Sequence, residues 1–132
     1  MAEKEAVRLE GVPAAVNPLT PGIRAGGFIF VSGQTGGRIV DGQRKVGEGI
    51  AEQTANCIEN MKAVLEAGGS SLAKVVKCTV FLTSMKDFAG MNGVYKEYFG
   101  ADGAAFPARS TVEVSALANP ALIVEIEAVA LA

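Results

Sequence analysis

Hydrophobic residues recur along the chain with two different periods, and each period predicts a different kind of element. Apolar side chains fall at helical spacing from Ile50 to Ala67, and a pair of glycines follows where a left-handed residue commonly ends a helix. A second helical stripe runs to Phe99, with Ser84 placed to cap its first turn and Gly100 to end it. The pattern therefore predicts two helices.

Segments rich in β-branched and aromatic residues predict the strands. In chain order they are residues 6–9, which carry the weakest signal, then 28–32, 75–82, 108–114 and 122–131. A turn around Asn119 and Pro120 indicates that the last two strands form an antiparallel pair. The order of elements is β, β, α, β, α, β, β, and it predicts an α+β protein.

Both predicted helices lie at crossover positions, where the right-handed connection rule places them on one face of a single mixed sheet. The other face then has no cover, although the strands offer apolar side chains to both sides. Because a monomer rarely leaves a sheet-sized apolar surface in water, we expect this open face to pack against identical neighbours. Such packing favours sites at subunit boundaries, and the pattern leaves the number of subunits open.

Composition narrows the possible chemistry. The chain has 132 residues, about the length of one soluble domain, so residues 1–132 are expected to form a single domain. The sequence has no histidine, which excludes Ser-His-Asp and Cys-His catalysis and every His-ligated metal site. Cys57 and Cys78 match no metal-ligand spacing. We therefore expect two buried free thiols and no metal site.

The charge balance bears on partners and location. The 12 Lys and Arg residues against 14 Asp and Glu residues give a net charge of −2, so no overall positive field attracts nucleic acid or anionic lipid. No apolar run approaches the about 20 residues that cross a bilayer, and the acidic N-terminal segment resembles neither a signal nor a transit peptide. We expect a cytoplasmic protein without a membrane or nucleic-acid partner, with an organelle left open.

Charged residues on two predicted strands are candidates for chemistry. Arg109 follows a proline in FPARSTVEV, and its planar guanidinium suits a small carboxylate, although spacing alone favours an arginine paired with Glu113 or solvated. Glu125 and Glu127 project from one face of the last strand, where a carboxylate could orient water or accept its proton. An ordinary polar face is the alternative.

Two further segments leave their roles open. VSGQTGG, residues 31–37, lacks the spacing of both the Walker and the G-x-G-x-x-G phosphate loops, which argues against nucleotide binding. A tight turn is its default interpretation, and a strand end with free N–H groups for an anionic oxygen is the alternative. Asn92 on the second helix is either a surface residue or a hydrogen-bonding wall of a pocket.

Four motifs in this order resemble the RidA family of reactive-intermediate deaminases: PAAVNP at residues 13–18, FVSGQ at 30–34, FPARSTVEV at 106–114 and VEIEAVA at 124–130. The resemblance spans nearly the whole chain. It implies a chorismate-mutase-like α+β fold and a homotrimer with clefts between subunits. It also implies hydrolysis of 2-imino or enamine acids to 2-keto acids and ammonia, without a cofactor.

The resemblance also implies roles for individual residues. Arg109 matches the arginine that holds the substrate carboxylate, and Glu125 matches the glutamate near the reacting carbon and water. Ser32 and Gly33 would line the cleft, with Asn92 close by.

Two positions depart from the family pattern. Leu19 stands where the family often has a tyrosine, and Thr111 stands where it commonly has a cysteine. Both remain candidate substrate contacts, without the phenol and the thiol.

Two classes of function follow from these observations. The leading one is an imine and enamine hydrolase acting on small 2-imino acids. The other is a ligand-binding or regulatory trimer of the same fold with little activity, in which the cleft holds a keto acid. RNA cleavage, a third activity linked to the family, conflicts with the net charge of −2 and the absence of histidine.

Overall fold

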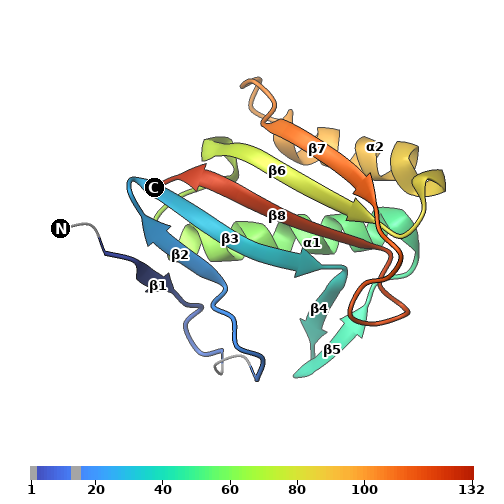
Figure 1. Cartoon of the computed structure of the whole chain (residues 1–132), viewed down its shortest axis with the longest axis horizontal. Coiled ribbons are helices and arrows are strands. Elements are labelled where there is room, and N and C mark those ends of the chain that lie inside the picture. Colours follow the sequence, from blue (N-terminus) through green and yellow to red (C-terminus); the bar gives the residue numbers. More distant parts are fainter. Residues whose placement is uncertain (1–2, 13–15) are drawn as a thin grey trace.

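A six-stranded mixed sheet forms the centre of the computed structural model, which describes residues 3–12 and 16–132. In chain order the elements are β1 (Glu5–Val7), β2 (Gly22–Ala25), β3 (Phe28–Thr35), β4 (Gly37–Val40), β5 (Gln43–Val46), α1 (Gly49–Ala67), β6 (Val75–Leu82), α2 (Phe88–Phe99), β7 (Ala108–Glu113) and β8 (Val124–Leu131). The large sheet has the order β1-β2-β3-β8-β6-β7, and β4 and β5 form a separate hairpin (Figure 1).

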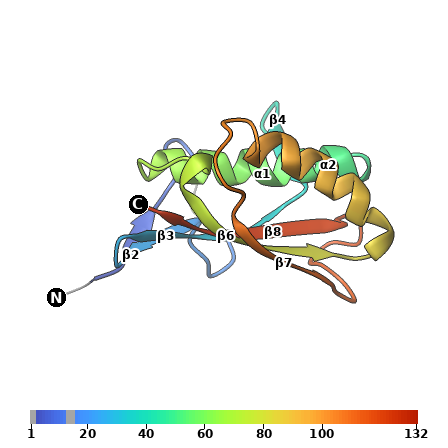
Figure 2. The ribbon, with the colours of Figure 1, turned by 90° about the horizontal axis from the view of Figure 1, so that it is seen from above.

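Both helices pack on the same face of the large sheet, as the connection rule predicts (Figure 2). The core lies between the helices and this face, where alternate residues of the central strands are buried. The largest fully buried side chains include Ile29, Ile58, Met61, Leu65, Leu82, Met91 and Ile126. Apolar positions with a period of two on the strands and a helical period on α1 therefore meet in one layer.

Two buried polar residues of α1 tie irregular segments to the core. The Gln53 side-chain amide donates to the carbonyls of Gly47 and Ala121, at 3.0 and 2.9 Å, and its Oε1 accepts from the Ile123 N–H at 2.9 Å. Asn56 donates to the Gly36 carbonyl at 2.9 Å. Because buried polar groups cost free energy unless paired, these bonds fix the path of the chain into β4 and β8.

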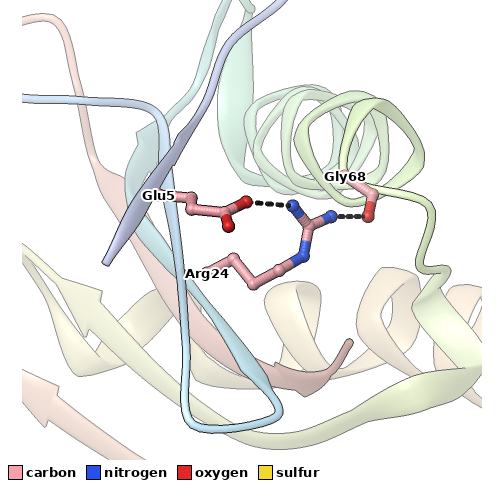
Figure 3. A network of polar contacts seen from close by, with 3 residues as sticks. All are labelled: Glu5, Arg24 and Gly68. Atoms are coloured by element: carbon pink, nitrogen blue, oxygen red, sulfur yellow. Dashed lines mark hydrogen bonds and ion pairs between the residues drawn. The ribbon is translucent and has the colours of Figure 1, made fainter. Parts of the chain in front are cut away.

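Arg24 connects the edge of the sheet to the end of α1 (Figure 3). Its guanidinium donates to the Gly68 carbonyl just after the helix and lies 3.5 Å from the carboxylate of Glu5 on β1. A cation at a helix C-terminus satisfies a free carbonyl and interacts favourably with the helix dipole. This contact holds the two N-terminal strands, β1 and β2, against the helical layer.

The strand order corrects one prediction. β7 and β8 are not a pair, because β6 lies between them, parallel to β7 and antiparallel to β8. The predicted turn at Asn119 is present, since the Asn119 carbonyl accepts from the Leu122 N–H at 3.0 Å. After this turn, however, the chain enters the sheet between β3 and β6 and not beside β7. One face of β8 is wholly apolar and buried, as fits this central position: Val124, Ile126, Ala128 and Ala130.

Other element boundaries differ in detail. Sequence reasoning missed β2, β4 and β5, and β1 begins one residue earlier than predicted. The segment read as a default turn continues β3 through Thr35, with an irregular register between Val31 and Gln34. Ser84 caps a short 3₁₀ helix, Met85–Asp87, by accepting from the Lys86 N–H, and α2 begins only at Phe88.

The uncovered face of the sheet carries exposed apolar side chains, as the pattern predicts. Phe28 and Phe30 on β3 are 38% and 46% exposed, and Val112 on β7 is 43% exposed. Phe30 pairs with Val129 and Val112 with Phe81, positions that alternate with the core-facing residues. A row of large apolar side chains across several strands is typical of a surface that another protein covers.

Candidate active site

Arg109 lies on the helix-covered face of β7. It pairs in register with Cys78, a fully buried core residue of β6, so the two side chains point to the same side of the sheet. Thr111 and Glu113 pair with Val80 and Leu82 and share this face, as the sequence predicts. The guanidinium is thereby directed toward α2.

Residues of α2 hold the Arg109 guanidinium on several sides. Its Cζ lies 4.8 Å from the centre of the Tyr95 ring and 5.7 Å from that of Phe88, within the range of cation–π contacts. Nη1 donates to the Asn92 side-chain oxygen at 2.8 Å and lies 3.8 Å from the Met91 sulfur. These contacts fix the plane of the guanidinium and leave part of its donor fork unused.

Glu113 does not pair with Arg109, which corrects the alternative that spacing favoured. The Glu113 carboxylate instead accepts from the Met85 N–H at 2.8 Å. Among residues 3–12 and 16–132 the single ion pair is that of Arg24 and Glu5, so Arg109 has no carboxylate partner there. A half-buried guanidinium held by neutral groups is suited to bind a carboxylate from outside the chain.

The free side of Arg109 opens into a cavity of about 360 Å³. Its lining residues are Asn92, Tyr95, Lys96, Phe106, Pro107 and Arg109. Small-molecule pockets commonly enclose roughly 300 to 1,000 Å³, so this one matches a small metabolite. Asn92 is therefore a wall of this cavity, the second of the two roles that the sequence left open.

Glu125 occupies the opposite face of the sheet. It pairs with Phe81 on β6 and Thr35 on β3, positions that alternate with the core, and its side chain is half-buried. Burial, and secondarily the negative charge of Glu127, raise the pKa of the Glu125 carboxyl above its ordinary value. A carboxyl whose pKa is raised is suited to exchange protons with a substrate or water.

Gly33 lies directly against the Glu125 carboxylate. A Cβ at position 33 would overlap Oε2 of Glu125 and lie 2.9 Å from its Cδ, so a larger residue fits there only if the carboxylate moves. Gly33 falls in the irregular part of β3, where the regular pairing with β8 is interrupted. The strand irregularity and the missing side chain together make the space that the carboxylate fills.

Ser32, the residue before this glycine, lines a hollow together with Leu19. The Ser32 hydroxyl donates to the Thr20 carbonyl at 2.5 Å, which ties β3 to the segment before β2. A hollow of about 540 Å³ is lined by Lys4, Arg8, Asn17, Pro18, Leu19, Thr20, Ile23 and Ser32. Leu19 is 51% exposed, so its apolar side chain is available to a ligand or a neighbouring chain. The first half of the PAAVNP motif, residues 13–15, lies outside the described residues.

The predicted residues therefore form two groups that a single chain does not bring together. Arg109, Asn92 and Thr111 share the helix-covered side of the sheet, and we call them the arginine half-site. Glu125 on the uncovered face, with Gly33 against its carboxylate, is the centre of the other group, the glutamate half-site. One strand, β6, lies between the strand of Glu125, β8, and the strand of Arg109, β7.

Sequence reasoning identified Asn92 but missed the apolar and aromatic residues that position Arg109. Phe88, Met91 and Tyr95 fall on one helical stripe, which indicates a core face, and nothing in that spacing shows that Arg109 packs on it. The Thr111 hydroxyl is buried without a hydrogen-bond partner in the described part of the chain. A buried hydroxyl of this kind is a free donor or acceptor within the arginine half-site.

The remaining predictions concern thiols, metals and membranes. Cys57 and Cys78 are both free and buried, as predicted, and burial raises the pKa of the Cys78 thiol to about 11. Across the described ranges, no three His, Cys, Asp or Glu side chains are grouped to hold a metal. No helix within the described residues is both long and apolar enough to span a bilayer.

Comparison with known proteins supports the resemblance. The family model described as Endoribonuclease L-PSP matches residues 10–132. A RutC family protein of Pyrococcus horikoshii is 46% identical and covers 96% of this chain and 97% of its own. The 2-iminobutanoate/2-iminopropanoate deaminase of Escherichia coli K12 is 39% identical, with 94% of each chain covered.

Solved structures show the same fold. The YjgF gene product of Escherichia coli superposes with a TM-score of 0.87 at 37% sequence identity, covering 96% of this chain and 98% of its own. The predicted chorismate-mutase-like α+β fold is confirmed.

Proposed function

Because the chain belongs to the RidA, or endoribonuclease L-PSP, family, we propose that it hydrolyses 2-imino acids and their enamine tautomers to 2-keto acids and ammonia. The observation that carries the proposal is the state of the Arg109 guanidinium. Neutral groups of α2 hold it in place, and it forms no ion pair with any carboxylate of the described residues. An anion from outside completes such a site. The carboxylate of a 2-imino acid is an anion of suitable size and geometry.

We further propose that the working site combines the arginine half-site of one protomer with the glutamate half-site of another, in a homotrimer. One chain places Arg109 and Glu125 on opposite faces of the sheet, so both reach one small substrate only when two chains meet. The exposed apolar side chains on the uncovered face supply a surface for that contact. The proposed ligands of the cleft are small imino and keto acids, with no cofactor and no nucleic acid.

Each half-site has one part of the proposed reaction. Arg109 binds the substrate carboxylate through its remaining N–H donors, while Asn92 keeps the guanidinium plane fixed. Glu125 takes a proton from water as the water oxygen bonds to C2 of the protonated imine, R–C(=NH₂⁺)–COO⁻, and the carbon–nitrogen double bond becomes a single bond with its electron pair on nitrogen. The product of this step is a carbinolamine, R–C(OH)(NH₂)–COO⁻.

The second step releases ammonia. The protonated Glu125 carboxyl gives its proton to the amino nitrogen, and the hydroxyl proton returns to Glu125 as the carbon–nitrogen bond breaks. Ammonia leaves with the bonding electron pair, the carbonyl of the keto acid forms, and the proton on Glu125 passes to ammonia. Because the pKa of Glu125 is raised, its carboxylate is a stronger base than that of an ordinary surface glutamate, and a larger fraction of the carboxyl is protonated and available as an acid.

Subunit complementation tests both parts of the proposal. Arg109→Ala and Glu125→Gln each remove one half-site, and each variant alone is expected to be inactive toward 2-iminopropanoate. When the two variants are co-expressed, random assembly pairs the intact halves at about a quarter of the interfaces, so about a quarter of wild-type activity is expected. The matched control is the Arg109→Ala/Glu125→Gln double variant, which has no intact half and stays inactive.

The outcomes separate the alternatives. Activity in the mixture shows that the two half-sites come from different chains. An inactive mixture with an active wild type refutes the shared site but not the hydrolysis. A wild type that binds 2-oxobutanoate without turning over any imine refutes the hydrolysis and favours the ligand-binding trimer.

A further inference from the structure

The cavity beside α2 is lined by two positively charged side chains, one of them Arg109, and by no carboxylate. Lys96 and Arg109 are its charged residues, and the remaining lining consists of Asn92 and the apolar or aromatic Tyr95, Phe106 and Pro107. In the described part of the chain neither cation has an ion-pair partner. Two positive charges beside one small cavity repel each other until an anion lies between them.

The placement of Lys96 fits a ligand with charges at both ends. Lys96 follows Asn92 by four residues on α2, so the two share one face of the helix, about 6 Å apart along its axis. Asn92 is the residue that bonds the Arg109 guanidinium, at 2.8 Å. A ligand held at Arg109 therefore extends toward Lys96 along the helix surface.

The walls between the two cations are apolar. Tyr95 is buried beneath the guanidinium, whereas the Phe106 ring is 52% exposed at the opening. Such walls suit a short methylene chain between the two charged ends. A monocarboxylate leaves Lys96 without a partner, and a dicarboxylate satisfies both cations.

From this arrangement we infer that the preferred substrates are dicarboxylic 2-imino acids of four or five carbons, with the second carboxylate bound by Lys96. The inference rests on the proposed hydrolysis and names its substrate class. Lys96 is then a specificity-determining residue, because it contacts the distal carboxylate and not the reacting carbon. The products are dicarboxylic 2-keto acids and ammonia.

Lys96→Met tests the inference, because it keeps the length of the side chain and removes the charge. The substrates are 2-iminosuccinate and 2-iminopropanoate, each formed in situ by an amino-acid oxidase and followed by competition with semicarbazide. We expect wild type to favour 2-iminosuccinate, and Lys96→Met to lose on the order of tenfold in kcat/KM for it. Activity toward 2-iminopropanoate should change less than twofold.

Lys74→Met is the matched control, since Lys74 is also exposed but does not line the cavity. It should leave both rates unchanged. A Lys96→Met variant that changes both substrates equally, or neither, overturns the inference. Equal wild-type rates for the two imines overturn it as well.

Binding separates this inference from the proposed hydrolysis. Titration calorimetry with 2-oxoglutarate and 2-oxobutanoate measures ligand preference without turnover. Tighter binding of 2-oxoglutarate that is lost in Lys96→Met supports the dicarboxylate site even if no imine is hydrolysed, an outcome that refutes the hydrolysis alone. Hydrolysis of 2-iminopropanoate without any preference for 2-oxoglutarate refutes the dicarboxylate site alone.

Discussion

Gly33→Ala displaces the carboxylate of Glu125 while leaving every functional group in the protein. A Cβ at position 33 would overlap Oε2 of Glu125 and lie 2.9 Å from Cδ, against 3.4 Å or more for an ordinary contact. The backbone of Gly33 is not among those with positive φ, so alanine fits its conformation without strain. The change therefore acts on the position of the carboxylate.

The size of the effect follows from the displacement. The carboxylate is the far end of a flexible side chain, so it moves aside by roughly 1 Å at small cost in stability, within about 1 kcal/mol. A misplacement of about 1 Å at the reacting groups costs on the order of 10²-fold in rate, equivalent to about 2.7 kcal/mol in the barrier. Since Arg109 is untouched, we expect kcat to fall and KM for 2-iminopropanoate to stay within a few-fold.

The assay compares steady-state hydrolysis and thermal unfolding of wild type, Gly33→Ala and Gly93→Ala. Gly93 is a suitable control because a Cβ there meets no atom within 4 Å, and alanine in a helix is at least as stable as glycine. A Gly33→Ala variant with wild-type kcat would show that the carboxylate position is not critical and would refute the role given to Glu125. A large fall in melting temperature would instead show that the backbone moves.

Three further substitutions test individual roles. Arg109→Lys keeps the charge but loses the bidentate fork and the stacking on Tyr95, so kcat/KM for 2-iminopropanoate should fall on the order of 10²-fold, and near wild-type turnover would contradict the assignment. Because the pKa of Glu125 is raised in the folded protein, ionisation of this carboxyl lowers the free energy of unfolding, and the full loss is reached above the raised pKa. Below the ordinary carboxyl pKa of about 4.3 the carboxyl is protonated in both the folded and the unfolded state, so there is no loss. Glu125→Gln should therefore unfold at higher urea than wild type at pH 7 and at the same urea near pH 4, while equal midpoints at both pH values would contradict the raised pKa. Leu19→Tyr adds a hydroxyl beside Ser32, and one neutral hydrogen bond of about 0.5 to 1.5 kcal/mol should raise kcat/KM for 2-iminopropanoate about 2- to 12-fold; no change would show that position 19 does not contact substrate.

Strands and helices with strong local periodicity could be predicted from sequence. β6 matches its predicted bounds, and α1 begins one residue before its predicted start. The hairpin of β4 and β5 was missed, although the Asp41-Gly42 pair is a sequence signal for a two-residue hairpin turn. Both residues have positive φ, 51° and 77°, as such a turn requires. Its strands are too polar to show an alternating pattern.

Strand order could not be predicted, because neighbouring strands are chosen by long-range packing. A return through the turn at Asn119 is compatible with β8 beside β7, yet β8 lies between β3 and β6. The position of β8 in the sheet determines where Glu125 lies relative to Arg109. The sequence identifies Arg109 and Glu125 as candidates, but whether they share a face depends on their register with β6, where Arg109 pairs with Cys78 and Glu125 with Phe81.

The placement of Glu125 connects assembly to chemistry in the proposed trimer. The carboxylate is only half-buried in the single chain, where burial already raises its pKa. A neighbouring chain that covers the uncovered face removes more water from the carboxylate and brings a guanidinium to the substrate it faces. The first effect raises its pKa further, and the second binds the substrate anion beside it. With no histidine in the chain, a desolvated glutamate is the group that can exchange protons near neutral pH, and in the proposed trimer the neighbour completes that desolvation. In the proposed trimer, the contact that buries the apolar face therefore also completes the site and adjusts its acid–base group.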